Sequence, residues 1–285
     1  MNTESQHPGS SKQKKVAVIN DMSGFGRCAI TVALPIISKL KVQCCPVPTS
    51  IFSNHTGFDS FYYEDFTDHM QRYIDEWKKL DLQFSGVCTG FLGSSEQISI
   101  VERFLTDFKR PETKVIVDPV MGDYGKPYPT YTDELCQQMK KLVRFADILT
   151  PNTTEACVLT DTPYKDDWHM DELKAMAEKL AAQSESRQAK VVITGIRRGS
   201  FLANFCYENG KVTVVKTKKI GESRSGTGDV FSAILAADAV NNVDFTESVK
   251  KASVFIKECI KRSVEMELPL TDGVCFEECL YKLAR

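Results

Sequence analysis

The tetrapeptide Gly226-Thr227-Gly228-Asp229 has residue types and a spacing that suit phosphate chemistry. It stands directly before the apolar run 230–235, which predicts the start of a helix. Two glycines let the backbone turn tightly, so that consecutive N–H groups at the helix N-terminus can form an anion hole. A carboxylate beside that hole could accept the proton of an attacking hydroxyl. Taken alone the motif is not specific, because threonine or aspartate before a helix is also an ordinary N-cap.

Two other phosphate-binding motifs are absent or incomplete. The sequence G-x-x-x-x-G-K-[ST] does not occur. Gly24 and Gly26 begin like a dinucleotide fingerprint, but Ala29 stands where the third glycine is required. The next strand candidate contains cysteines and a proline at 44–46 instead of ending in an acid. A nicotinamide site is therefore disfavoured.

Acids also follow two apolar strand candidates. Asp118 and Asp123 come just after the run 115–117, and Asn152 and Glu155 follow the next short strand candidate. Carboxylates near strand ends, facing a phosphate hole, suit Mg²⁺ that is held largely through waters and phosphate oxygens. On their own, Asn152 and Glu155 are better interpreted as a capping box at the start of a helix.

Apolar periodicity predicts the elements that must position these residues. Short apolar runs alternate with segments that are apolar at helical intervals, which is typical of a mostly parallel sheet with helices on both faces. Asn209-Gly210 predicts a β-hairpin of 201–208 and 211–218, an antiparallel addition to that sheet. The predicted strands are 16–19, 42–48, 86–88, 115–117, 148–149 and 191–193, and the predicted helices are 28–40, 66–80, one from 94 or 95, 132–144, one from 152, 170–183, 227–241 and 244–264.

Polar residues stand where these strands end. Ligands of open parallel sheets bind outside the carboxyl ends of the strands, so the residues could surround one ligand. The alternative is that the strands simply turn into polar loops. The set comprises Asp21, Ser23, Ser50, Thr89, Asp118, Thr150, Asn152, Glu155 and Thr194.

Length and composition predict one globular domain. The chain has 285 residues, 42% of them hydrophobic, and we expect a domain at 14–285 after a disordered polar tail at 1–13. A net charge of −2 gives no electrostatic reason to expect a nucleic-acid or membrane partner. The ten cysteines contain no C-x-x-C and pair with no histidine at metal spacing. Reduced thiols, the absence of an apolar signal segment and the absence of an apolar run of about 18 residues predict a cytoplasmic protein.

Four motifs in chain order resemble the ribokinase-like superfamily. Three of them are the tetrapeptide 226–229, Asp-Pro-Val at 118–120 and Pro-Asn-x-x-Glu at 151–155. The fourth, Ser-Asn-His-Thr-Gly at 53–57, narrows the resemblance to the vitamin B6 kinases. The similarity runs from about Val16 to the C-terminal helices. It implies a ribokinase-like three-layer α/β sandwich that transfers the γ-phosphate of ATP to the 5′-hydroxymethyl group of pyridoxal, with pyridoxine and pyridoxamine as further candidate acceptors.

The resemblance also implies a role for each matching residue. Asp229 matches the catalytic base, and Gly226, Thr227 and Gly228 match the anion hole. Asp118 and Glu155 match residues around Mg²⁺ and a nearby monovalent cation, K⁺. A homodimer is expected from the resemblance alone. Phosphate-side or nucleotide contacts are assigned to Asp123, Thr150, Asn152 and Thr194, and acceptor contacts to Asp21, Ser23, Ser50, Phe52, His55 and Thr56.

Several assignments stay open. Pyridoxal kinases usually end the first strand with a serine, whereas this strand ends in Asp21 with Ser23 two residues on, so either side chain could contact the acceptor ring. His55 is equally well interpreted as a buried structural imidazole. The basic stretch before the anion hole leads to the hypothesis that Lys218 or Arg224 contacts phosphate.

Other functions also stay open. The pattern Asp21-x-Ser23-Gly24 is similar to the hydroxymethylpyrimidine kinases of thiamine synthesis, although those enzymes typically have cysteine in place of Asp229. A catalytically silent regulator that binds nucleotide or pyridoxal on the same fold is a second alternative. A sugar kinase is the third, and the 53–57 loop speaks against it.

Overall fold

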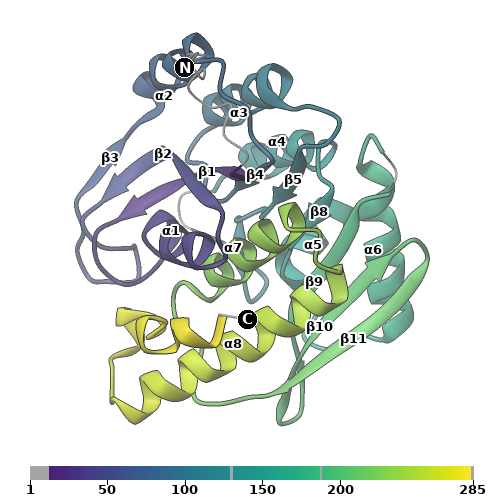
Figure 1. The fold of residues 1–285 in the computed structure, drawn as a ribbon. Helices are drawn as coiled ribbons and strands as arrows, with labels where there is room; N and C mark the ends of the chain where they lie inside the picture. The colour runs from purple at the N-terminus through teal and green to yellow at the C-terminus, as the bar shows by residue number, and fades with distance from the viewer. Residues whose placement is uncertain (1–12, 129–130, 187, 284–285) are drawn as a thin grey trace, which may run out of the picture.

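A nine-stranded sheet runs through the molecule, with helices on both faces (Figure 1). The computed structural model describes residues 13–128, 131–186 and 188–283. The strand order is β11-β10-β9-β8-β5-β4-β1-β2-β3. The six strands from β9 to β2 in this order pair in parallel, whereas β10, β11 and β3 are antiparallel to their neighbours. The predicted three-layer α/β sandwich with an antiparallel hairpin is confirmed.

The bounds of the elements follow the predicted alternation closely. The strands are β1 Lys15–Ser23, β2 Gln43–Phe52, β3 Tyr63–Asp65, β4 Gly86–Thr89, β5 Lys114–Val117, β6 Gly122–Asp123, β7 Lys126–Pro127, β8 Ile148–Leu149, β9 Lys190–Arg198, β10 Phe201–Glu208 and β11 Lys211–Lys218. The helices are α1 Ala29–Lys39, α2 Thr67–Lys79, α3 Ser95–Phe108, α4 Asp133–Val143, α5 Thr153–Thr160, α6 Met170–Gln183, α7 Thr227–Val240 and α8 Phe245–Glu265, followed by 3-10 turns at Leu270–Asp272 and Glu277–Leu283.

Strand β1 is buried on both faces, as expected for an interior parallel strand. Its alternating side chains point to opposite faces of the sheet. Val16 and Val18 pack in a core formed with α1, α7 and α8, while Ala17 and Ile19 pack in a second core formed with α2 to α6. These two cores fix the middle of the sheet, so the carboxyl end of β1 is held rigidly from both sides.

The sequence did not predict three short strands. β3 adds an antiparallel strand at the edge of the sheet, and β6 and β7 form a separate two-stranded hairpin. Strands of two or three residues are too short to show a periodicity. The predicted tail 1–13 lies outside the described residues except for Gln13, and the single domain at 14–285 stays a prediction.

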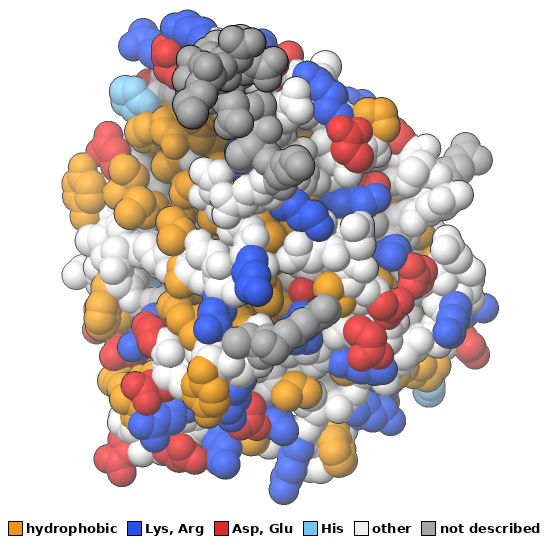
Figure 2. Space-filling model, viewed as in Figure 1, with side chains coloured by type: hydrophobic (Ala, Val, Ile, Leu, Met, Phe, Trp, Pro, Cys, Tyr) orange, Lys and Arg blue, Asp and Glu red, His pale blue; other side chains and the backbone are white. Residues whose placement is uncertain are grey.

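The surface charges and the cysteines can be compared with the predictions made from composition. Figure 2 shows basic and acidic side chains interspersed over the visible face. All ten cysteines are free, and seven of them are buried. Within the described part of the chain, no helix is both long enough and apolar enough to cross a membrane.

Candidate active site

The sheet has a topological switch point at β1. This strand pairs with β2 on one side and with β4 on the other, so the connections leave in opposite directions and open a crevice at the carboxyl ends. The predicted strand-end residues gather along this edge: Asp21 on β1, Thr89 on β4, and Asp118, Thr150 and Thr194 after β5, after β8 and on β9. Helix α7 lies across this part of the sheet (Figure 1).

The anion-hole candidate forms the start of α7. Gly226 is the N-cap with φ of 79°, a conformation that strains any residue with a Cβ. A Cβ at Gly226 would also lie 1.9 Å from the carbonyl oxygen of Arg27. Gly228, in contrast, has open space around its Cα. The chain therefore needs glycine at 226 in order to fold, while glycine at 228 leaves room beside the backbone amides.

Asp229 lies half-buried in the first turn of this helix. Its Oδ1 accepts a hydrogen bond of 3.1 Å from Nδ2 of Asn20 at the end of β1. Burial raises the pKa of Asp229, while hydrogen bonds from the Ala29 backbone and from Asn20 lower it. A carboxylate with raised basicity beside a set of helix N-terminal amides can take a proton from a hydroxyl while an anion sits next to it.

Asp21 faces Asp229 from the end of β1. It is 9% exposed, and burial together with the nearby charge of Asp229 raises its pKa to about 7. The hydroxyl of Ser23 donates to Oδ2 of Asp21 at 2.9 Å. Asp21 and Ser23 thus form one hydrogen-bonded pair, so a ligand that contacts either side chain also lies close to the other.

Asp118 and Glu155 form a second pair of acidic residues near α7. The hydroxyl of Ser232 donates to Oδ2 of Asp118, and Oε1 and Oε2 of Glu155 accept from the backbone amides of Met121 at 3.1 Å and Asn152 at 2.8 Å. Burial raises the pKa of Asp118 and of Glu155, and the charge of each acid's acidic neighbours adds to the effect. Neither carboxyl has a basic partner among the described residues, and two such buried carboxyls are suited to a cation.

The capping-box interpretation of Asn152 and Glu155 is confirmed. Oδ1 of Asn152 accepts from the Glu155 amide at 3.0 Å, and Glu155 returns a bond to the Asn152 amide. Nδ2 of Asn152 donates to the carbonyl of Gly122 at 2.7 Å, which ties α5 to the β6–β7 hairpin. In that hairpin, Asp123 accepts a hydrogen bond of 2.8 Å from the amide of Tyr124.

Three hydroxyls are buried at the strand ends: that of Ser50 faces Tyr63, that of Thr150 faces Asp118, and that of Thr89 has no hydrogen-bond partner among the described residues. Buried polar groups are nearly always paired, so the Thr89 hydroxyl marks a place where a ligand or water belongs. Thr194 is only half-buried and is joined to the Asn152 strand end by a parallel bridge.

The acceptor loop after β2 combines aromatic packing with a tie to the C-terminal segment. Phe52 is buried against Tyr63 and Phe91, with ring centroids 4.8 and 6.1 Å away. Nδ1 of His55 accepts from the Gly57 amide at 3.0 Å, which leaves Nε2–H to donate to the carbonyl of Thr271 at 2.7 Å. Both ring nitrogens of this imidazole are therefore used structurally.

Thr56, beside His55, is exposed. Its side chain has no protein partner in the described part of the chain, so it is available to a ligand.

Arg224, one of the two predicted phosphate contacts, lies against the C-terminal loop. Its guanidinium is buried and donates to the carbonyls of Leu268 at 2.8 Å, Pro269 at 2.7 Å and Gly273 at 3.4 Å. These bonds anchor the C-terminal loop beside the anion hole. Lys218, the other candidate, is exposed at the end of β11 and stays a candidate for phosphate.

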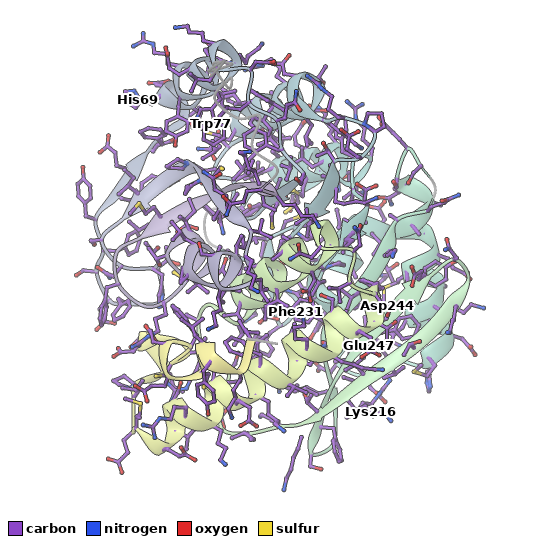
Figure 3. The ribbon with its side chains drawn as sticks, viewed as in Figure 1. His69, Trp77, Lys216, Phe231, Asp244 and Glu247 are labelled. Atoms are coloured by element: carbon purple, nitrogen blue, oxygen red, sulfur yellow. The ribbon has the colours of Figure 1, made fainter. Side chains whose placement is uncertain are left out.

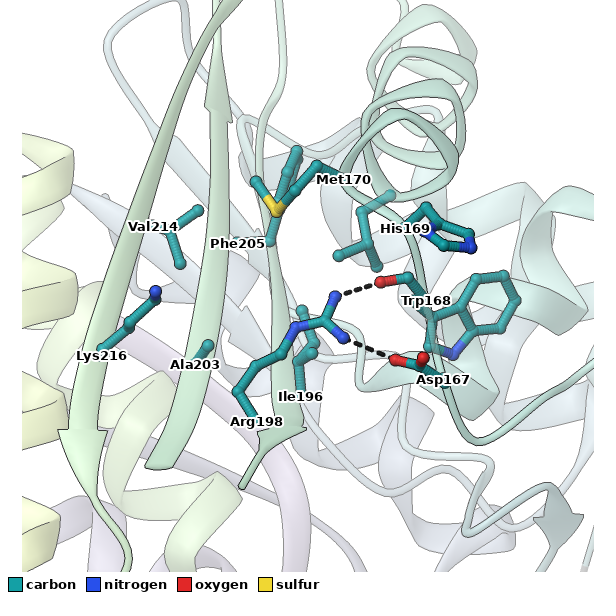
Figure 4. A pocket seen from close by; sticks show the side chains of 11 residues that line it. Asp167, Trp168, His169, Met170, Ile196, Arg198, Ala203, Phe205, Val214 and Lys216 are labelled. Carbon is teal, nitrogen blue, oxygen red and sulfur yellow. Dashed lines mark hydrogen bonds and ion pairs between the residues drawn. The ribbon is translucent and has the colours of Figure 1, made fainter. Parts of the chain in front are cut away.

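Other conspicuous side chains lie away from the crevice. His69 and Trp77 on α2 stand at the far side of the molecule from Lys216 on β11 (Figure 3). A cleft of about 480 Å³ opens between the start of α6 and β9–β11, where Arg198 bridges to Asp167 at 2.6 Å (Figure 4). None of the predicted site residues lines this cleft.

A family model described as phosphomethylpyrimidine kinase matches residues 30–270. The chain belongs to this family. A pyridoxal kinase of Corynebacterium diphtheriae is 25% identical over 248 residues, covering 83% of this chain and 85% of the relative. A hydroxymethylpyrimidine/phosphomethylpyrimidine kinase of Haemophilus influenzae is 27% identical over 194 residues, covering 66% and 69%.

A solved structure is more similar than these relatives. A phosphomethylpyrimidine kinase candidate from Bacteroides thetaiotaomicron, crystallised with pyridoxal, is 35% identical with a TM-score of 0.91. The match covers 95% of this chain and 96% of that one. The predicted resemblance to the vitamin B6 kinases is confirmed by these matches.

The acidic residues of the crevice also fit the metal that such kinases imply. The described residues hold no group of three or more His, Cys, Asp or Glu side chains that could bind a metal by themselves. Mg²⁺ in phosphate-transfer sites needs only one or two carboxylates, because waters and substrate phosphates complete its shell. Asp118 and Glu155 are buried and have no basic partner within the described ranges, so they supply such a reduced set.

Two residues that hold the site together were not singled out from the sequence. Asn20 contacts Asp229 directly, and Ser232, one helical turn after Gly228, contacts Asp118. The available signal for Ser232 was its place three residues after Asp229 on the predicted helix, a spacing that shares a helix face. For Asn20 the signal was a polar residue inside a buried strand.

Proposed function

We propose that this chain transfers the γ-phosphate of ATP to the 5′-hydroxymethyl group of pyridoxal. The observation that carries the proposal is the position of Asp229, a half-buried carboxyl of raised pKa beside the glycine-formed start of α7 and opposite Asp21. The pyridoxal complex of the similar Bacteroides protein supports the choice of acceptor. The name of the Corynebacterium relative supports it independently.

Asp229 acts as the base of an in-line transfer. It removes the proton of the acceptor hydroxyl as that oxygen attacks the terminal phosphate, and no covalent enzyme intermediate forms. The amides of 226–228 stabilise the negative charge that is spread over the transferring group. The rigid start of α7 holds these amides in place before the substrates arrive, so little reorganisation is needed at the moment of reaction.

Asp118 and Glu155 hold the cation side of the site. A bound Mg²⁺ would offset the charge of the phosphate oxygens there. Ser232 keeps Asp118 oriented toward the crevice, and the capping box fixes Glu155 on α5. Thr150 and Thr194 are proposed as phosphate or nucleotide contacts and Lys218 as a charge at the nucleotide edge. Because water would compete for the phosphate, we expect the β6–β7 hairpin with Asp123 to close over the bound nucleotide.

We propose that residues of β1, β2 and the loop after β2 bind the pyridoxal ring. The Asp21–Ser23 pair offers a carboxyl and a hydroxyl to the polar edge of the ring, and Phe52 and the exposed Thr56 border the loop above it. Ser50, buried near the end of β2 beside Tyr63, supplies a further polar group. His55 shapes this loop through its bond to Thr271 and is proposed as a structural residue.

Hydroxymethylpyrimidine is the alternative acceptor, favoured by the Asp21-x-Ser23-Gly24 pattern and by the name of the Haemophilus relative. A direct competition assay tests the proposal. The enzyme is given Mg-ATP with equal concentrations of pyridoxal and hydroxymethylpyrimidine, and both phosphorylated products are measured by mass spectrometry. Predominant pyridoxal 5′-phosphate is expected. Predominant pyrimidine phosphate would assign the chain to thiamine synthesis, and no product from either would favour the silent regulator.

Three secondary properties belong to the same proposal. We expect stimulation by K⁺ near Asp118 and Glu155, a homodimer and a cytoplasmic location. Replacement of K⁺ by tetramethylammonium in the activity assay tests the first. Sedimentation equilibrium tests the second.

A further inference from the structure

We propose that Asn20 is a positioning residue that holds the carboxylate of Asp229 in its reactive orientation through a single, enforced amide hydrogen bond. The inference rests on the proposed function, in which Asp229 is the base. Asn20 is 5% exposed and lies within the buried run of β1, directly before Asp21. Its Nδ2 donates to Oδ1 of Asp229 across 209 residues of sequence.

The orientation of this amide is fixed by its other end. Oδ1 of Asn20 accepts two backbone hydrogen bonds, from the amide of Asp21 at 2.9 Å and from the amide of Phe91 at 2.7 Å. Backbone N–H groups can only donate, so the oxygen of the side chain must face them. The NH₂ group is thereby left with one direction, toward Asp229.

The space for the amide comes from Gly90, directly after β4. A Cβ at Gly90 would lie 2.4 Å from Cγ and 2.5 Å from Nδ2 of Asn20. The amide of Gly90 itself bonds to the carbonyl of Ile19 at 2.8 Å, so the backbone at this point cannot move away freely. β1 and β4 together therefore form a slot for one side-chain amide at the switch point.

A neutral donor suits the electrostatics around Asp229. Burial raises the pKa of Asp229, and the imidazole of His55 lowers it. The charge of Asp229 in turn raises the pKa of Asp21 on β1, of Asp118 after β5 and of the Cys28 thiol, so these groups also face it. The amide favours the ionised form without placing a permanent positive charge on the base. A lysine or arginine in the same place would hold the carboxylate more tightly and make it a poorer proton acceptor.

The first test replaces Asn20 by aspartate. Asn20→Asp keeps an oxygen for the amides of Asp21 and Phe91 but presents an acceptor, or a charge, to Asp229. We expect kcat at pH 7 to fall at least tenfold and the acidic limb of the kcat–pH profile to move up by about one unit or more. The KM for ATP should change less than twofold. A merely structural role would lower stability without moving the limb.

The second test reaches the same amide from Gly90. Gly90→Ala pushes the side chain of Asn20 aside, so it should reproduce the loss of kcat and the shift of the acidic limb. In Asn20→Ala the side chain that the methyl group introduced by Gly90→Ala would meet is gone. The double variant should therefore have the same kcat as Asn20→Ala alone. Additive losses, or an acidic limb that stays at the wild-type pH in Asn20→Asp, would overturn the inference.

One further measurement separates this inference from the proposed function. The carboxyl of Asp229 is titrated by NMR in protein labelled with ¹³C at the aspartate carboxyls, with Asp229→Asn as the assignment control. A wild type that does not phosphorylate pyridoxal would defeat the proposed function alone. An unchanged Asp229 titration in Asn20→Asp would defeat the positioning role alone.

Discussion

Asp21 should destabilise the ligand-free protein at neutral and alkaline pH, and its replacement by asparagine should relieve this. Burial and the charge of Asp229 raise the pKa of Asp21 from 3.8 to about 7 in the folded chain. An acid with a raised folded pKa binds more protons when folded than when unfolded. Its effect on stability is therefore harmless below about pH 4 and grows unfavourable as pH rises to about 7.

The size of the effect follows from the two pKa values. Each pKa unit corresponds to about 1.4 kcal/mol, so charging Asp21 costs at most about 4 kcal/mol above pH 7 and about 1.5 kcal/mol at pH 5. Asparagine keeps an oxygen for the Ser23 hydroxyl and carries no charge. The stabilisation by Asp21→Asn should thus be about 2.5 kcal/mol larger at pH 8 than at pH 5, which is about 4 °C in Tm for a chain of this size.

Differential scanning fluorimetry of wild type and Asp21→Asn between pH 5 and pH 8, without ligands, measures this difference. Asp59→Asn is the matched control, because Asp59 is exposed and its carboxyl has no partner in the described part of the chain. The control should show no pH-dependent change in Tm. A Tm difference for Asp21→Asn that is the same at both pH values, or smaller at pH 8, would refute the reasoning.

Three further predictions concern the anion hole and its surroundings. Gly226→Ala should lower Tm by about 5 °C or more, because its Cβ meets the Arg27 carbonyl, whereas Gly228→Ala should leave Tm unchanged and raise the KM for ATP; equal Tm values for both variants would contradict this. Arg224→Met should lower the free energy of unfolding by about 2–4 kcal/mol in urea titration, and Arg72→Met, at an exposed position, is the control. Unaltered stability together with a raised KM for ATP would instead indicate that Arg224 contacts phosphate. Lys218→Glu should raise the KM for ATP severalfold while Lys211→Glu, at the opposite end of β11, should not, and identical KM values would remove Lys218 from the site.

The sequence predicts the sheet and the site edge well because both depend on local patterns. Alternating apolar runs identify β1, β4 and β5, and the carboxyl ends of parallel strands meet at one edge whatever the loops do. The glycine pattern of the anion hole is equally local, since Gly226 is required by its own φ. For the same reason the capping box of α5 was predictable.

The remaining contacts join segments that are distant in the chain. Asn20 reaches Asp229, and Arg224 and His55 reach carbonyls of the C-terminal loop, across 44 to 216 residues of sequence. No periodicity encodes such a pairing, because it depends on how the loops stack at the edge of the sheet. Arg224 is an example: a basic residue before an anion hole suggests a phosphate contact, but the buried guanidinium donates to the carbonyls of Leu268 and Pro269, which no local pattern indicates.

The most direct test of the account is a comparison of wild type and Asp229→Asn in a coupled ADP-release assay with Mg-ATP and pyridoxal, with ATP affinity measured in parallel by calorimetry. We expect turnover by the wild type, a loss on the order of a hundredfold or more in the variant, and nearly unchanged ATP binding. Wild-type turnover in Asp229→Asn would contradict it, because the base would then lie elsewhere.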